Sequence, residues 1–531
     1  MDAHTLAPLL DASSAPPRKR GLRVCGLVVI GFFWVSGGIY GNEELVSAAP
    51  PLVVVSFTAL MPLLFSLPSA LMTAELATAF PTDGGQVAWV ELAFGPSLGA
   101  HNAYWLWLTN LFDAAVYPQM AAQYLAAALR PCGVQMGGDT QRLVCWAVVA
   151  AVATLNLLGL AWITMSQAVI FVASVGPCLL YILYGLPHLD LSHAAATQGP
   201  IDPALLLSWS LWLYSGFSWL GHLAGKVDSP RRTYLGCIAV LLPLVTTLNL
   251  LPFLVSLSLD PITAHYAQPA YFNHLAGRLA GPWLQTLFTI GANVSLVGLY
   301  HSQMLAADVT LHSFACARLR PRAPPEGRAT GGGEAEAGEA GGRAGEGDGE
   351  EAWRVEGGGE ERGEGEGGGE ERGERGARRE GAGGKGPSAQ GGERRWSWLC
   401  LRADRGVPPA AVLLDTACVG ALMLTSYQVL VEIEMMLFCL GHLLFLAAFV
   451  VLRVQHPGVP RAFKIPGGVA ACAALQVIPA SVCIATIGIN MKEPSKRTWF
   501  GAVLLLGLLT HAAVLLMKRH LPLLRRLLSL R

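Results

Sequence analysis

The sequence predicts an all-α integral membrane protein with about twelve transmembrane helices. Of its 531 residues, 53% are hydrophobic and only 14% are charged, whereas an average soluble domain has about 25% charged residues. The charges gather in short loops and in one long insert, and long apolar runs separate them. Because a backbone amide in lipid must find its partner within its own segment, these apolar runs are expected to form helices.

The apolar runs have the length that a bilayer requires. A hydrocarbon core about 30 Å thick is crossed by roughly 20 apolar residues in a helix. The first run follows Arg18-Lys19-Arg20 and is too long for a signal peptide, so we expect it to stay as a membrane anchor. The fourth and fifth runs almost touch at Ala161-Trp162. The expected spans are residues 22–48, 52–80, 98–128, 143–160, 163–186, 204–224, 235–258, 281–306, 409–427, 430–453, 468–490 and 498–517.

The basic residues of the loops predict an orientation. Lysine and arginine gather before the first span and after the sixth, tenth and twelfth spans. These loops lie on one side of a bundle with about twelve alternating spans, and a basic bias marks the cytoplasmic side. Both termini are therefore expected in the cytoplasm. The basic cluster from Lys492 to Arg497 follows the eleventh span and is an exception to this pattern.

The composition divides the chain into five segments. Residues 318–405 consist mainly of Gly, Glu, Arg and Ala, cannot bury an apolar core and are expected to be disordered. This insert is either a regulatory or docking segment or a tolerated low-complexity insertion. The expected segments are a cytoplasmic tail (1–21), helices one to eight (22–317), the insert (318–405), helices nine to twelve (406–517) and a basic cytoplasmic tail (518–531).

Two spans contain glycine-rich interruptions, and these predict the substrate site. Glycine lets the backbone leave helical geometry, and irregular backbone survives inside a membrane only where it lines a cavity or is packed in protein. The interruptions lie in spans one and six, and paired interruptions in corresponding spans indicate a transporter site. The alternative is that the glycines only allow helices to pack closely. The predicted substrate-binding residues at the breaks are Gly37, Gly38, Tyr40, Gly41, Ser215, Gly216 and Phe217.

Acidic residues occur inside the spans, and basic residues are nearly absent from them. A buried acid costs roughly 3 kcal/mol on insertion scales, so it is expected to face a cavity or a partner. Acids without internal lysine or arginine suit a cationic substrate, a proton or both. Asp415, Glu432 and Glu434 lie near span ends, where exposure to water is an alternative. The candidates for cation binding or proton coupling are Glu43, Glu75, Asp113 and Glu434, with Asp113 also predicted to bind substrate.

Several classes of protein are excluded by the motifs. The sequence has no phosphate-binding loop, no nucleophile elbow and no metal-ligand spacing, so we expect neither an enzyme nor a metal or cofactor. Transport is then not driven directly by ATP, and an ion gradient remains as the energy source. The formal net charge is +0, and no basic surface with aromatic residues indicates a nucleic-acid partner.

Several long strings resemble one transporter family. The stretch Gly38-Ile39-Tyr40-Gly41-Asn42-Glu43-Glu44 looks like a broken first helix, and residues 69–89 (SALMTAELATAFPTDGGQVAW) look like a second helix and its loop. Asp113 to Pro118, Leu223 to Pro230, Glu434 to Phe449 and Arg461 to Pro466 are similar to later parts of the same family. The chain thus resembles the amino acid–polyamine–organocation superfamily, in its plant and protist polyamine-uptake, L-type amino acid transporter-like branch.

The resemblance implies a fold and an activity. The implied fold is a LeuT-like five-plus-five inverted repeat with two extra C-terminal helices and broken helices one and six. Substrate would lie between the breaks, surrounded by helices three, eight and ten, and proton symport is the coupling of the branch. The expected location is the plasma membrane, and the expected partners are the lipid bilayer, protons and a polyamine or amino acid.

The sequence departs from the branch at three acidic positions, and the substrate therefore stays open. Phe217-Ser218 stands where the branch has a Trp-Asp pair, and Gln303 and Phe445 stand where it often has glutamates. The main expectation is proton-coupled import of polyamines, amino acids or both by alternating access. The alternatives are a neutral or cationic amino acid permease without polyamine transport, and a nutrient receptor that does not transport.

Overall fold

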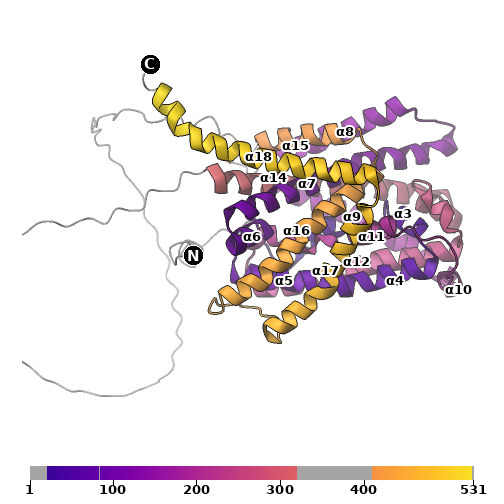
Figure 1. Cartoon of the computed structure of the whole chain (residues 1–531). Helices are drawn as coiled ribbons and strands as arrows, with labels where there is room; N and C mark the ends of the chain where they lie inside the picture. Colours follow the sequence, from indigo (N-terminus) through magenta and orange to yellow (C-terminus); the bar gives the residue numbers. More distant parts are fainter. Residues whose placement is uncertain (1–20, 83, 159, 320–408, 529–531) are drawn as a thin grey trace, which may run out of the picture. The chain divides into compact units, whose positions relative to one another are not determined.

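The computed structural model describes residues 21–82, 84–158, 160–319 and 409–528, and all regular elements within these ranges are helices. Within the described residues, an isolated β-bridge joins Leu22 to Val227. Each of the twelve expected spans coincides with helical structure (Figure 1). The helices over these spans are α2 (Val24–Val35) with α3 (Glu43–Ser47); α4 (Pro51–Met61), η3 (Pro62–Ser66) and α5 (Leu67–Ala79); α7 (Pro96–Leu129); α8 (Gly138–Leu158); α9 (Leu160–Gly185); α11 (Pro203–Trp212) with η6 (Ser215–Lys226); α12 (Pro230–Leu259); α14 (Pro282–Leu319); α15 (Pro409–Leu422); α16 (Tyr427–Gln455); α17 (Gly468–Asn490); and α18 (Pro494–Leu528).

Six helical stretches in the described part of the chain are long and apolar enough to cross a membrane. They are Pro51–Ala79, Gly138–Leu158, Met165–His188, Pro230–Leu259, Tyr427–Gln455 and Gly468–Asn490. Together with the all-helical structure they confirm the predicted class of an all-α membrane protein. Short helices connect the longer ones: α6 (Gln86–Phe94), η4 (Arg130–Cys132), η5 (Leu186–His188), α10 (Leu191–Ala194), η7 (Thr263–Ala267) and α13 (Tyr271–Ala280).

Some helices run past the expected boundaries. The helix α14 continues to Leu319, where the insert was expected to have begun, and α18 continues to Leu528, within the expected C-terminal tail. The division between the fourth and fifth spans falls between Leu158 and Leu160. The expected disorder of the insert concerns residues that lie almost wholly outside the described ranges.

The backbone is interrupted at both glycine-rich stretches. The helix α2 ends at Val35 and α3 begins at Glu43, and between them Gly37, Gly38 and Gly41 have φ values of +65°, +99° and +85°. Side chains with a Cβ atom rarely adopt such angles, which explains why glycine occupies these positions. In the second stretch, α11 ends at Trp212 and the chain resumes as the 3₁₀ helix η6.

The helix α7 is the central packing element for the two interrupted helices. It packs most extensively against α14 and α16, which lie alongside it in Figure 1. The 3₁₀ helix η6 packs against α2 and α5. Residues from α2, α7, α14 and α16 therefore meet around the two breaks.

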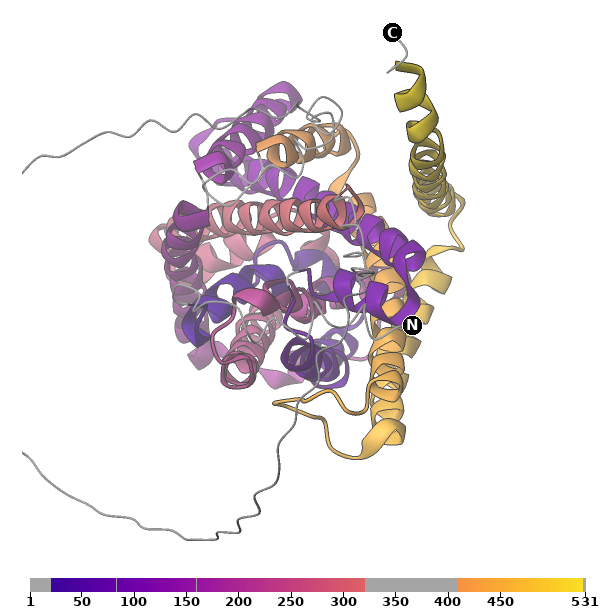
Figure 2. The same ribbon diagram turned by 90° about the vertical axis from the view of Figure 1, so that its left-hand side faces the viewer.

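The last two helices carry apolar side chains on their outer faces. Both α17 and α18 contact α16, and they lie toward one edge of the helices in Figure 2. Ile484 of α17 and Leu509 of α18 are 61% and 58% exposed. Large exposed apolar surfaces are unfavourable in water but are normal where a helix faces lipid.

A polar cluster closes the loop that follows α12. Asp260 accepts hydrogen bonds from the hydroxyl of Tyr271, from the amide of Ile262 and from His265 Nδ1, the last at 2.8 Å. Burial raises the pKa of Asp260, but the hydrogen bonds from Tyr271 and His265 outweigh it and hold this pKa below its usual range. The carboxylate of Asp260 thus holds the loop together as an anion.

Candidate functional site

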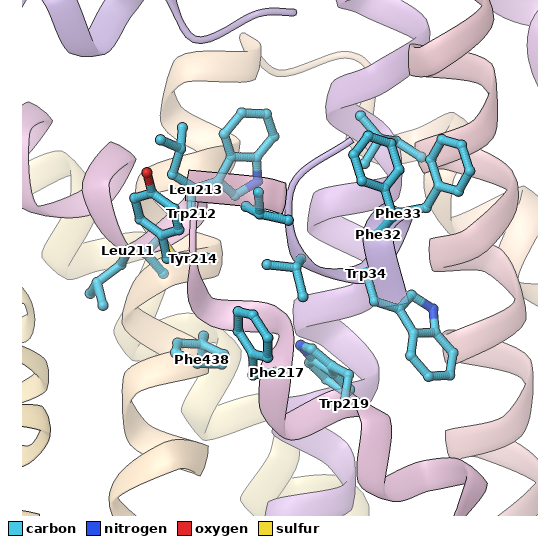
Figure 3. Packing of buried hydrophobic residues seen from close by; sticks show 14 of the residues in the cluster. Phe32, Phe33, Trp34, Leu211, Trp212, Leu213, Tyr214, Phe217, Trp219 and Phe438 are labelled. Carbon is cyan, nitrogen blue, oxygen red and sulfur yellow. The ribbon is translucent and has the colours of Figure 1, made fainter. Parts of the chain in front are cut away.

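The two helix breaks lie against each other. A Cβ atom built on Gly216 would lie 1.8 Å from the carbonyl oxygen of Trp34, so the start of η6 touches the end of α2 through its backbone. Only glycine permits this approach. Figure 3 shows the Phe32–Trp34 end of α2 beside the segment that runs from Trp212 to Trp219.

Side chains from the neighbouring helices hold the first break in place. The Ser295 hydroxyl of α14 donates a hydrogen bond to the Gly37 carbonyl oxygen at 2.5 Å. The Asn42 side-chain amide donates to the Gly38 carbonyl oxygen at 3.0 Å. Two carbonyl groups of the break are therefore satisfied by side chains, as buried carbonyl groups require.

A pocket opens between the two breaks, and we call it the central pocket. It is bounded by α2 and its break, by α7, by α11 and η6, by Leu299 and Gln303 of α14, and by Glu434 of α16. Its polar and aromatic lining includes Trp34, Ser36, Asn42, Asn110, Asp113, Tyr117, Trp212, Ser215, Trp219, Gln303 and Glu434. No lysine or arginine is among the residues that line it.

Two acidic side chains face the central pocket. Asp113 is 4% exposed and accepts hydrogen bonds from the Tyr117 hydroxyl at 2.7 Å and from Trp212 Nε1 at 2.8 Å. Glu434 is 3% exposed, and its Oε2 has no hydrogen-bond partner in the described structure. The charges of the two carboxylates interact with each other, so the pocket is built to hold positive charge.

Several further polar atoms of the central pocket have no partner in the described part of the protein. They are Asn42 Oδ1, Asn110 Nδ2 and Gln303 Oε1, and each of these side chains is at most 5% exposed. Buried polar atoms in folded proteins are almost always hydrogen-bonded, so the unpartnered atoms around this pocket are positions where a polar ligand or water can bind. With Glu434 Oε2, three of the four atoms are acceptors, which favours a ligand that donates hydrogen bonds.

A second pocket lies next to the first break, and we call it the Glu43 pocket. It is lined by acids and aromatic residues, including Glu43, Glu44, Tyr124, Tyr266 and Tyr427. The Tyr124 hydroxyl donates a hydrogen bond to Glu43 and accepts one from the amide of Gly41 at 3.0 Å. Glu44 accepts a hydrogen bond from the Tyr427 hydroxyl at 2.8 Å. This pocket is acidic too, and no lysine or arginine is among its lining residues.

The structure distributes the predicted binding residues over different places. Asp113 and Ser215 line the central pocket and Gly41 lines the Glu43 pocket, whereas the remaining five are not among the lining residues of either. The Tyr40 hydroxyl donates to the Ser174 carbonyl oxygen at 2.8 Å. Phe217 is buried and lies near Phe438 in Figure 3. The residues of this second group are Gly37, Gly38, Tyr40, Gly216 and Phe217, and they shape the backbone around the pocket.

The candidates for cation binding or proton coupling are also separated. Asp113 and Glu434 share the central pocket, and Glu43 lies in the neighbouring one. Glu75 lines neither pocket. It pairs with Arg453 at 2.6 Å and Arg461 at 3.2 Å, and its charge is thereby neutralised inside the protein.

The alternative that acids near span ends are simply exposed to water is wrong for the three acids concerned. Asp415 is 0% exposed and accepts a hydrogen bond from Trp107 Nε1 at 2.9 Å. Glu432 is 8% exposed and pairs with Lys496 at 2.8 Å. Glu434 faces the central pocket, as described above.

Sequence reasoning missed Asn110, Trp212 and Gln303 as pocket residues. Asn110, Asp113 and Tyr117 are spaced by three and four residues, so they lie on one face of α7. This spacing could have identified Asn110 once Asp113 was selected. No local signal identifies Trp212, whose indole reaches an acid 99 residues earlier in the chain.

The sequence matches the model of the amino acid permease family over residues 23–323, which include both breaks and α7. The chain belongs to this family. It is therefore a membrane transporter and not an enzyme, as the sequence predicted. The match also confirms the resemblance drawn from the motifs.

The chain is similar to proteins that are named polyamine transporters or amino acid transporters. Polyamine transporter PUT1 of Oryza sativa subsp. japonica is 25% identical over 476 residues, which cover 90% of this chain and 75% of the relative. Polyamine transporter RMV1 of Arabidopsis thaliana is 25% identical over 484 residues, covering 90% of this chain and 83% of the relative. The b(0,+)-type amino acid transporter 1 of Mus musculus is 24% identical over 231 residues, covering 42% of this chain and 46% of the relative.

Proposed function

We propose that this transporter imports small organic cations, polyamines in the first place, by proton-coupled alternating access. The observation that carries the proposal is the central pocket, which holds two buried carboxylates and unpartnered acceptors but no basic side chain. The similarity to proteins named polyamine transporters supports the same substrate class.

The lining of the central pocket fits an ammonium group. A buried charge must be paired to be tolerated, and Asp113 and Glu434 supply negative charge from two different helices. Trp34, Trp212 and Trp219 also line the pocket, and indole faces attract cations. A primary ammonium donates three hydrogen bonds, which matches the acceptors Asn42 Oδ1, Gln303 Oε1 and Glu434 Oε2.

The second pocket favours an elongated cargo with charge at both ends. The Asn42 side chain lines the central pocket, and its neighbours Gly41 and Glu43 line the other. A diamine that passes Glu43 and Glu44 and then binds at Asp113 and Glu434 meets acidic side chains in both pockets. We assign Glu43 and Glu44 to attracting and guiding the cation, and Asp113 and Glu434 to holding it.

An amino acid permease is the competing function. The glycine-rich break offers backbone amides to a substrate carboxylate, and one amino acid transporter is among the relatives. A neutral amino acid would nevertheless leave one of the two carboxylates in the central pocket without a counter-charge. This argument favours a diamine over a neutral amino acid.

The proposed membrane layout has twelve spans, which form an inverted five-plus-five repeat followed by α17 and α18. Both termini lie in the cytoplasm, and the protein resides in the plasma membrane. The loop charges and the positions of the helices support this layout. The basic cluster after α17 is less of an exception than its sequence implies, because Lys496 pairs with Glu432 at 2.8 Å and with Glu493 at 2.7 Å. Its charge is thereby neutralised locally.

The test uses the full-length protein, purified and reconstituted in liposomes. Labelled putrescine and labelled leucine are each offered with and without an inwardly directed proton gradient. We expect the gradient to drive putrescine accumulation, and excess unlabelled leucine to compete weakly. Uptake of leucine alone would replace this proposal by the amino acid permease.

A deletion addresses the remaining alternative of a nutrient receptor. Removing residues 330–395 takes out most of the low-complexity insert. A transporter keeps its putrescine flux in liposomes after this deletion. Absence of flux in the intact protein would favour the receptor.

A further inference from the structure

A second pair of buried acids lies away from both pockets. Asp308 of α14 is 1% exposed and Asp415 of α15 is 0% exposed. The two carboxyl groups are within hydrogen-bond reach of each other. Both oxygens of Asp308 and Oδ2 of Asp415 have no donor among the described residues, and Asp415 Oδ1 accepts from Trp107 Nε1 at 2.9 Å.

Among the described residues, no positively charged side chain interacts with this pair. The titratable groups that interact electrostatically with it are Tyr300 of α14 and Cys418 of α15, and α7 contributes the uncharged indole of Trp107. Tyr300 is 0% exposed, and its hydroxyl has no hydrogen-bond partner in the described structure. The Tyr300 hydroxyl is therefore a donor without a partner that is close enough to interact electrostatically with Asp308 and Asp415.

Two negative charges cannot both persist in contact in a dry interior. The cost of burying each charge is several kcal/mol, and their mutual repulsion adds to it. One positive charge must therefore be shared between the carboxyl groups. Neither pocket described above is lined by Asp308 or Asp415, so the pair is separate from the proposed cargo site.

The chemistry of the pair also disfavours a metal ion. Calcium takes six to eight oxygen ligands, whereas no group of three or more His, Cys, Asp or Glu side chains that could hold a metal occurs in the described part of the chain. The smallest cation, a proton, needs only the two carboxyl groups: one carboxyl O–H donates a hydrogen bond to the other carboxylate.

We propose that Asp308 and Asp415 together bind the proton that drives transport, at a site separate from the cargo. The proton enters the pair from one side of the membrane and leaves it toward the other, with no other bond made or broken. After release the two carboxylates repel each other and must move apart. The Tyr300 hydroxyl, which has no hydrogen-bond partner in the described structure, can then donate a hydrogen bond in place of the lost carboxyl O–H. This inference rests on the proton coupling of the proposed function and assigns it to named residues.

The pair is connected to the central pocket through two helices. Asp308 lies five residues after Gln303 on α14, and Trp107 lies six residues before Asp113 on α7. These two helices also pack extensively against each other. A change in the spacing of α14, α15 and Trp107 on proton release therefore reaches both walls of the pocket, which is a physical route for coupling.

The test compares driven uptake with exchange in liposomes that contain the full-length protein. We make Asp308→Asn and Asp415→Asn, with Asp139→Asn as the matched control because its side chain is 99% exposed. Both buried variants should lose putrescine accumulation driven by a proton gradient by about tenfold or more, while putrescine–putrescine exchange at equal pH stays near that of the unchanged protein. The control should keep both activities.

The outcomes separate the two proposals. If the unchanged protein shows no response to the proton gradient, the coupling in the proposed function fails. If it responds and both buried variants respond equally well, only the assignment to Asp308 and Asp415 is overturned. Loss of exchange together with driven uptake in well-folded variants also overturns it, because the pair would then serve the cargo.

A milder variant keeps the proposal testable if the buried variants do not fold. Trp107→Phe removes only the hydrogen bond to Asp415. Because this bond stabilises the deprotonated form, its loss should move the pH of half-maximal driven uptake upward. An unchanged pH profile in the folded variant overturns the proposal.

Discussion

Replacing Asp113 by asparagine tests the central pocket most directly. The asparagine keeps an oxygen in the position that accepts hydrogen bonds from the Tyr117 hydroxyl and Trp212 Nε1 at 2.7 and 2.8 Å. The shape of the pocket should therefore survive. What disappears is one of the two negative charges in a pocket without lysine or arginine.

The size of the effect follows from the lost charge. A hydrogen bond to a charged group contributes about 1.5–3 kcal/mol, because one partner carries a full charge in a poorly solvated site. A loss of about 2 kcal/mol corresponds to roughly a 30-fold weaker affinity. We therefore expect the KM for putrescine to rise by about this factor, with Glu434 retaining part of the attraction.

The assay is initial-rate uptake of labelled putrescine in liposomes with equal amounts of reconstituted protein. Asp139→Asn serves as the control, since it makes the same chemical change on a side chain that is 99% exposed. Thermal unfolding in detergent verifies that both variants are folded. A folded Asp113→Asn protein with an unchanged KM for putrescine would refute the role of Asp113 in cation binding.

Three other predictions concern the backbone contact, the buried ion pairs and the loop acid. Gly216→Ala should abolish putrescine uptake or lower the yield of folded protein, because the added Cβ lies 1.8 Å from a backbone oxygen. The control Gly176→Ala, whose added Cβ has no atom within 4 Å, should behave normally in uptake and gel filtration. Glu75→Gln leaves two buried arginines without a counter-charge and should lower the free energy of unfolding by about 3–5 kcal/mol, which a lower Tm would show. The control Glu493→Gln should change the free energy of unfolding by less than about 1 kcal/mol. The pKa of Asp260 is lower in the folded protein than in the unfolded chain. The stability that Asp260 contributes is therefore complete above the unfolded pKa of about 3.9 and is lost as the pH falls below that value. Asp260→Asn should flatten the dependence of Tm on pH below about pH 4, and an unchanged slope contradicts this assignment.

The helices were predictable because their signal is local. Each apolar run has the length of a membrane span, and each expected span coincides with helical structure. The breaks were predictable for the same reason, since Gly37, Gly38 and Gly41 adopt positive φ values that other residues avoid. The ends of α14 and α18 were not, because each helix continues past the apolar run that marked the expected span.

The partners of the buried acids were not predictable, because they are distant in the chain. Glu75 pairs with Arg453, 378 residues later, and this pairing changes a candidate for proton coupling into a closed ion pair. Asp308 lies two residues past the expected end of the eighth span, at 306, and was therefore not considered as a membrane acid. Whether an acid faces a cavity, an arginine or another acid depends on packing that a single sequence does not show.

The contacts of Glu75 and the contacts of Glu44 differ in the strength of their bonds. Near the Glu75 end, one carboxylate holds Arg453 and Arg461 and also accepts the amide of Ile465 at 2.7 Å. Near the Glu43 pocket, Glu44 is held by uncharged donors, the Tyr427 hydroxyl at 2.8 Å and the Gln428 amide at 3.3 Å.

This difference has a consequence for alternating access. Ion pairs in a dry site are costly to separate unless each charge finds a new partner, whereas hydrogen bonds from neutral side chains exchange readily with water. Separating Glu44 from its partners at the Glu43 pocket therefore breaks hydrogen bonds from uncharged donors, which water can replace. Opening at the other end requires water or a second acid to receive two arginines. In the proton-driven cycle proposed above, the coupling ion supplies the free energy for this second step, and the proposed proton site on α14 and α15 lies away from the cargo.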